Sequence, residues 1–168
     1  MEGFIMYSET FPSRLRETRK SHGLTQNWVA NDLGISQQNL SRYEKGITEP
    51  DLETLSQLAD YYGVSTDFLI NNGMHEFHGF EPESSWDGVK ISTKDFPKKL
   101  KLARAIKGQS QLNASNALGI PQSTLAKYEL GQLQPSLETL AKITLYYRMR
   151  ADWFLGLTEE QEAIKKAN

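Results

Sequence analysis

The sequence contains no cysteine and no long apolar run, and both absences limit the classes of protein to which it can belong. With no cysteine among 168 residues, the chain forms no disulfide and offers no thiolate as nucleophile or ligand. It contains no run of about 18 apolar residues and no secretory signal pattern. We therefore expect a cytoplasmic protein with no membrane partner.

The patterns that mark catalytic centres are absent as well. The sequence has no nucleophile–base constellation, no glycine-rich phosphate loop and no carboxylate pair in a recognisable setting. His75 and His78 have a spacing that metal ligands use, but no third ligand lies near them in the sequence. The sequence therefore predicts no enzyme, no metal site and no cofactor.

Charge is unevenly distributed between the two halves of the chain. Residues 1–85 hold 6 Lys and Arg against 13 Asp and Glu, a net of −7, and residues 86–168 hold 13 against 8, a net of +5. The sum is the overall −2. Any attraction to nucleic-acid phosphates is expected to come mainly from the second half.

One stretch of sequence occurs twice and organises the chain. Residues 25–46 read TQNWVANDLGISQQNLSRYEKG, and residues 110–131 read SQLNASNALGIPQSTLAKYELG. The match extends without a gap from 11–71 to 96–156, an offset of 85 positions, and about 23 of 61 aligned residues are identical. Chance does not produce an ungapped match of this density, so the chain is an internal duplication.

Apolar spacing and capping residues predict short helices in each repeat. Within 25–46 the apolar residues fall at the spacing of two amphipathic helices. Gly34 interrupts that pattern, and Ser36 can cap a second helix with its side-chain oxygen. The first helix is expected over 11–22, with Pro12 in its first turn. Counterparts in the second repeat are expected at roughly 96–107, 110–118, 121–130, 136–147 and 150–156.

A short apolar segment precedes each repeat. Residues 3–8, GFIMYS, and their equivalents 88–93, GVKIST, read as short strands. A lone short strand is unstable, which favours antiparallel pairing of the two. The predicted fold is mainly α, with two tandem five-helix domains related as a pseudo-two-fold internal dimer around a small central β-pair.

The expected domain boundaries follow from the duplication. The first strand and helical domain occupy 1–71, a connector 72–87, the second strand and helical domain 88–157, and a tail 158–168. The connector contains Gly and Pro but also apolar side chains that we expect to pack between the two halves. These side chains are Met74, Phe77, Phe80 and Trp86.

Polar residues of the third helix suit the major groove of DNA. Gln pairs bidentately with adenine edges and Arg with guanine edges, and Gln37, Gln38 and Arg42 are expected on the outer side of this helix. A solvated polar face is the alternative interpretation for a single copy. The presence of two copies favours DNA.

Both repeats share a recurring set of residues. In the first repeat these are Leu15, Arg19, Thr25, Gln26, Ala30, Leu33, Gly34, Ile35, Leu40, Tyr43, Glu44, Gly46, Pro50, Leu52 and Leu55, and the second repeat keeps most of them. With this set each repeat resembles the lambda-repressor-like helix-turn-helix domain of the Xre (Cro/repressor) family. In that family the second and third helices form the DNA-reading unit, and the third lies in the major groove.

The resemblance assigns roles to individual positions. Base reading falls on Gln37, Gln38, Arg42, Gln122, Ser123 and Lys127, and phosphate contact on Gln26, Gln111, Ser36, Asn39 and Thr124. The resemblance also pairs Arg19 with Glu44 and Arg104 with Glu129. We interpret these as structural ion pairs rather than catalytic residues, because one half-buried charge requires the other.

Two features depart from the family pattern. The loops after the third helices, ITEP and QLQP, lack the basic residues that grip phosphate, and Glu49 opposes it. Trp28 is bulky for its position in the second helix. We expect its side chain to pack in the core, and contact with a base or with the DNA backbone is the alternative.

The resemblance implies a sequence-specific protein for double-stranded DNA. We expect a transcriptional regulator of repressor type, like those common on phages, plasmids and conjugative elements. It would act as a monomeric internal dimer that reads two unlike half-sites. One alternative is an accessory DNA-binding protein of a plasmid, phage or conjugative element. The other is an interaction module, antitoxin-like or anti-repressor, whose partner is a protein. The acidic first half favours that alternative.

Overall fold

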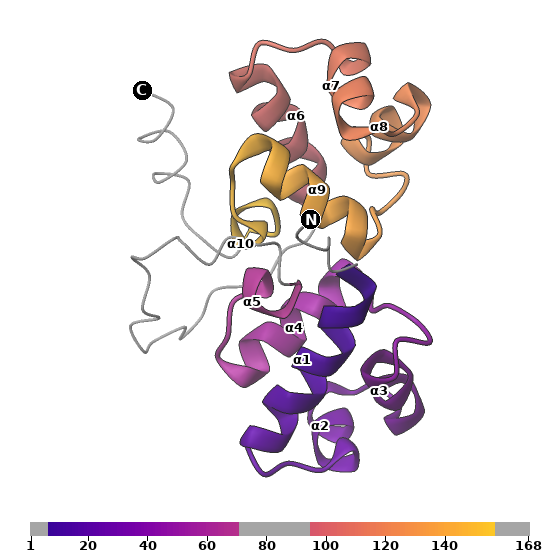
Figure 1. The fold of residues 1–168 in the computed structure, drawn as a ribbon, viewed down its shortest axis with the longest axis vertical. Helices are drawn as coiled ribbons and strands as arrows, with labels where there is room; N and C mark the ends of the chain where they lie inside the picture. The colour runs from indigo at the N-terminus through magenta and orange to yellow at the C-terminus, as the bar shows by residue number, and fades with distance from the viewer. Residues whose placement is uncertain (1–6, 71–94, 157–168) are drawn as a thin grey trace, which may run out of the picture. The chain divides into compact units, whose positions relative to one another are not determined.

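The computed structural model describes residues 7–70 and 95–156, and these residues form ten helices. The described helices separate into two compact units, one coloured indigo to magenta and the other red to yellow in Figure 1. We call residues 7–70 unit one and residues 95–156 unit two. Neither described range contains a helix long and apolar enough to cross a membrane.

Each unit contains five helices in the same order. Unit one holds α1 (Tyr7–Ser21), α2 (Gln26–Leu33), α3 (Gln37–Glu44), α4 (Leu52–Tyr62) and α5 (Thr66–Ile70). Unit two holds α6 (Phe96–Ile106), α7 (Gln111–Leu118), α8 (Gln122–Glu129), α9 (Leu137–Tyr147) and α10 (Ala151–Phe154). The mainly helical fold with two tandem domains is therefore confirmed.

The core of unit one is mainly aliphatic and receives buried side chains from every helix. Leu15 of α1, Leu40 of α3 and Leu55 of α4 have no exposed surface. α1 packs against both α3 and α5, and α2 packs against α3. Truncating a leucine buried in this way to alanine costs about 2–5 kcal/mol, so these residues fix the position of α3 on the rest of the unit.

Unit two repeats this core and adds aromatic rings at its end. Leu100, Leu125 and Leu140 stand at the equivalent positions and are also fully buried. Trp153 and Phe154 of α10 meet edge to face, with ring centroids 5.0 Å apart. Trp153 is 4% exposed, whereas its counterpart Phe68 in unit one is 43% exposed. The last helix of unit two is therefore more firmly packed.

The start of α1 differs from the sequence prediction. The helix begins at Tyr7 rather than at residue 11, so Pro12 lies inside it. Pro12 is the sixth residue of α1, beyond the first turn, so the helix lacks the backbone hydrogen bond that another residue would donate there. In unit two the prediction is accurate, because Pro97 lies in the first turn of α6.

The expected central β-pair finds no support in the described residues. None of them forms a strand, and Tyr7, expected at the end of the first strand, is helical. Residues 1–6 and 88–93 lie outside the described ranges, as do the connector 72–87 and the tail 158–168.

Candidate nucleic-acid interface

In unit one, local capping bonds define a helix, a tight turn and a second helix. Thr25 caps α2, and its hydroxyl oxygen accepts a hydrogen bond from the backbone N–H of Trp28 at 3.2 Å. Gly34 ends α2 in the left-handed region at φ 67°, where a side chain would be strained. Ser36 then caps α3 by accepting from the N–H of Asn39 at 3.1 Å. These bonds define where α2 begins and ends and where α3 begins.

Unit two makes the same turn with one difference. Ser110 caps α7 by accepting from the N–H of Asn113 at 3.1 Å, and Gly119 ends that helix at φ 66°. Pro121 occupies the N-cap position of α8, where it provides no side-chain cap. The start of α8 therefore lacks the side-chain hydrogen bond that Ser36 gives α3.

The residues predicted to read bases lie on the exposed side of each third helix. In α3 the side chains of Gln37, Gln38 and Arg42 are exposed, whereas Leu40 points into the core. In α8 the three base-reading positions are exposed as well, whereas Thr124 is more buried than its equivalent Asn39. There Gln122, Ser123 and Lys127 are exposed, Thr124 is half-buried and Leu125 is fully buried.

A bidentate ion pair joins α1 to the end of α3. Arg19 Nε donates to Glu44 Oε1 at 2.6 Å, and Arg19 Nη2 donates to Oε2 at 2.9 Å. Arg19 Nη1 donates to the carbonyl of Leu24 at 2.7 Å. The side chain of Glu44 is 2% exposed and that of Arg19 is 11% exposed, so each charge depends on the other.

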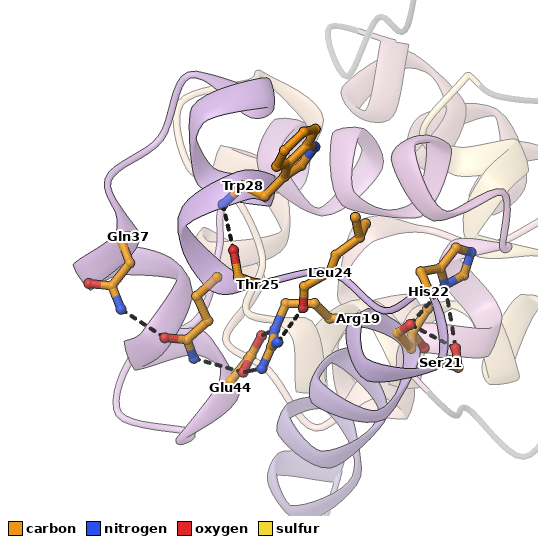
Figure 2. Close-up of polar contacts among 10 residues, drawn as sticks. Arg19, Ser21, His22, Leu24, Thr25, Trp28, Gln37 and Glu44 are labelled. Carbon is orange, nitrogen blue, oxygen red and sulfur yellow. Dashed lines mark hydrogen bonds and ion pairs between the residues drawn. The ribbon is translucent and has the colours of Figure 1, made fainter.

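Gln26 extends this ion pair to the exposed face of α3. Its amide nitrogen Nε2 donates to Glu44 Oε2 at 2.9 Å, and its oxygen Oε1 accepts from Gln37 Nε2 at 2.8 Å. The dashed contacts in Figure 2 follow this chain from Gln37 to Glu44 and Arg19. A buried charge therefore orients an exposed amide through one intervening side chain.

Unit two contains the inner part of this network. Arg104 donates to Glu129 at 2.6 Å and 3.0 Å, and Gln111 Nε2 donates to Glu129 Oε2 at 2.9 Å. The described structure has no hydrogen bond from Gln122 to Gln111. The base-reading amide of α8 is therefore not oriented in the way that Gln37 is.

The ion pairs also shift the acidity of their members. Burial by itself would raise the pKa of Glu129, but hydrogen bonds from Arg104 and Gln111 outweigh it and hold the pKa below its usual range. The hydrogen bond to Glu44 raises the pKa of Arg19, and that to Glu129 raises the pKa of Arg104. Arg19, Arg104 and Glu129 are therefore charged at neutral pH.

The expected burial of Trp28 is wrong. Its side chain is 62% exposed, while the neighbouring Val29 and Ala30 fill the core. At the third position of α2 the side chain points away from the packed face, and Figure 2 shows its ring apart from the Arg19–Glu44 pair. A helical register that starts at Gln26 would have indicated this exposure.

Sequence reasoning missed the double role of Gln26. It assigned Gln26 and Gln111 to phosphate alone, whereas both also donate to the buried glutamate of their unit. The recurrence of Gln beside the Arg and Glu pair at equivalent positions was the signal available. Within the described ranges no group of three or more His, Cys, Asp or Glu residues could hold a metal ion, and His75 and His78 lie outside those ranges.

Comparison with known proteins gives two matches to one family. The helix-turn-helix family HTH_3 matches residues 15–69 and 100–154. Relatives include the SPbeta prophage-derived HTH-type transcriptional regulator YonR of Bacillus subtilis strain 168, 45% identical over 40% of this chain and 62% of its own length. Another is the HTH-type transcriptional regulator ImmR of the same organism, 46% identical over 34% of this chain and 45% of its own.

A phage protein gives a third example. The cryptic phage CTXphi transcriptional repressor RstR of Vibrio cholerae is 39% identical over 37% of this chain and 56% of its own length. The chain thus spans about half to three fifths of the length of these relatives. No solved structure matches the chain significantly.

Proposed function

Because the chain belongs to the HTH_3 helix-turn-helix family, with both units matched, we propose that it is a sequence-specific protein for double-stranded DNA that regulates transcription as a repressor. The observation that carries this is the exposed, polar α3 and α8 set on buried leucines. Relatives are described as transcriptional regulators, one of them a repressor of a phage.

Base reading is proposed for the exposed residues of the two third helices. Gln37 and Gln38 suit adenine, and Arg42 suits guanine. Each good bidentate contact discriminates against the wrong base by about 1–3 kcal/mol. Because α8 offers Gln122, Ser123 and Lys127 instead, the two half-sites differ in sequence.

Phosphate contact is proposed at the starts of the second and third helices. The amide of Gln26 uses one hydrogen for Glu44 and retains a second for a phosphate oxygen. The hydroxyl of Ser36 accepts from Asn39 and retains its own hydrogen. Backbone N–H groups at the start of α2 and α7 favour an anion there as well.

The two units are proposed to act as a covalent pair. Single-domain proteins of this kind bind two half-sites about 34 Å apart as two-fold dimers. Here one chain contains two reading units, so a monomer is expected to protect an imperfect palindrome. The duplication supports this, and the relative placement of the units remains part of the proposal.

Selection of bound sequences from a random duplex pool tests this function. The expected result is one site with two unlike halves, bound with a steep negative slope of log affinity on log salt. The opposing candidate is an interaction module that binds protein only, which the acidic composition of unit one favours. No binding to any duplex at low salt would contradict the proposed function and favour that candidate instead.

A further inference from the structure

The outer face of α6 exposes aliphatic side chains between lysines. Leu102 is 43% exposed and Ile106 is 41% exposed. They lie four residues apart and therefore on the same side of the helix. Lys98, Lys101 and Ala105 are also exposed and share this side. We call these five residues the α6 outer face.

Unit one shows that the fold does not require apolar residues on this face. The equivalent positions of α1 are all polar, and Leu102 and Ile106 correspond to Glu17 and Ser21, both exposed. The remaining equivalents are Ser13, Arg16 and Lys20. Because α1 packs with these residues in the same five-helix arrangement, the aliphatic pair on α6 serves something other than folding.

The same contrast recurs elsewhere on unit two. Four further leucines are exposed, and each stands where unit one has a polar residue. Leu112, Leu130, Leu133 and Leu145 correspond to Asn27, Lys45, Thr48 and Asp60. Unit one has exposed apolar residues of its own, but none of them lies on the outer face of its first helix.

We propose that the α6 outer face docks an acidic amphipathic helix of a partner protein. An apolar stripe on the partner would cover Leu102 and Ile106, and carboxylates beside it would meet Lys98 and Lys101. Residues 95–156 hold nine Lys and Arg against four Asp and Glu, a net of +5. The surrounding charge therefore also favours an acidic partner.

Two other occupants fit less well. A second copy packed α6 against α6 would bring the lysines of one face against those of the other, which costs free energy. DNA would receive no hydrogen bond from Leu102 or Ile106. The inner side of α6, formed by Leu100 and Ala103, packs in the core with α8, so the outer face lies on the opposite side of the helix. A partner there leaves the exposed side of α8 open.

The probe is a labelled peptide of about three heptads, with Leu at heptad positions a and d and Glu at positions e and g. Its binding to the full chain is followed by fluorescence anisotropy, with a peptide bearing Lys at e and g as the charge control. The test variant is Leu102→Glu/Ile106→Ser, which installs the residues of unit one and is therefore compatible with the fold. Leu145→Asp, which replaces an exposed leucine of another helix, α9, is the matched control. Circular dichroism checks folding.

The expected result is that the acidic peptide binds, that the basic peptide does not, and that the test variant binds at least tenfold more weakly. The control variant should bind as the parent does, and the test variant should keep its affinity for duplex DNA. No binding of the acidic peptide at about 1 mM, equal binding of both peptides, or an unaffected test variant would overturn the proposal. Loss of a dimer in the test variant would identify a second copy as the occupant, and loss of DNA binding would identify DNA.

Discussion

Removal of the Glu44 carboxylate should destabilise unit one severely. In Glu44→Ala, Arg19 loses two hydrogen bonds and Gln26 loses one. The Arg19 side chain, 11% exposed in the parent, then keeps only its hydrogen bond to the carbonyl of Leu24. Breaking a buried pair on one side costs about 3–5 kcal/mol. For a domain of this size each kcal/mol lowers the unfolding temperature by about 4–8 °C, so a fall of roughly 12–40 °C is expected.

Differential scanning calorimetry of the full chain measures this change. The Glu129→Ala variant is the matched control, because Arg104, Glu129 and Gln111 repeat the geometry in unit two. Each variant should lower the transition of its own unit. Replacing both charges, as in Arg19→Met/Glu44→Leu, should recover much of the loss, because no buried charge is then left unpaired.

Two outcomes would contradict a structural role for the Arg19–Glu44 ion pair. If Glu44→Ala left the unfolding temperature unchanged while DNA binding disappeared, the pair would be functional and the reasoning refuted. Equal stability of the single and double variants would also contradict it, since the argument depends on the cost of an isolated buried charge.

Three further predictions follow from individual contacts. The pKa of Glu129 is lowered in the folded protein, so its ionisation stabilises the fold above the unfolded pKa of about 4.3, and this stability is lost as the pH falls through the folded pKa. The free energy of unfolding, measured in urea from pH 7 to 3, should therefore depend less on pH in Glu129→Gln than in the parent. Identical pH profiles of the two proteins would count against the pKa shift. Gln26→Ala should reduce base preference at the position read by Gln37, whereas Gln111→Ala should not do so at the position read by Gln122. The reason is that Gln26 accepts a hydrogen bond from Gln37, and Gln111 accepts none from Gln122. Selection of bound sequences with each variant measures this, and equal effects would mean that the orientation of Gln37 does not matter for base preference. Trp28→Ala should lower the free energy of unfolding by less than about 0.5 kcal/mol and Trp153→Ala by about 3–5 kcal/mol. The reason is that the side chain of Trp28 is 62% exposed and that of Trp153 is 4% exposed. Chemical denaturation measures both changes, and a large loss in Trp28→Ala would show that its ring is packed.

The sequence by itself determined the repeat and its helices. An ungapped match at fixed offset has few explanations, and the glycines that end α2 and α7 mark the turns because their backbone adopts positive φ. Local signals were also sufficient to place Leu40 and Leu125 inside and Gln37 and Gln122 outside, since helical periodicity alone separates these faces. Local signals failed at Pro12, whose missing donor matters less to α1 than the pattern implied.

Only the tertiary structure decided how the two units differ. Gln26 and Gln111 occupy equivalent positions of the two repeats, yet Gln26 accepts a hydrogen bond from the third helix and Gln111 does not. That difference depends on side-chain positions across two helices, which no spacing along the chain encodes. The sequence also left open whether Leu102 and Ile106 are buried. The exposure of an apolar residue depends on its neighbours in space, which only the packing of α6 in the tertiary structure defines.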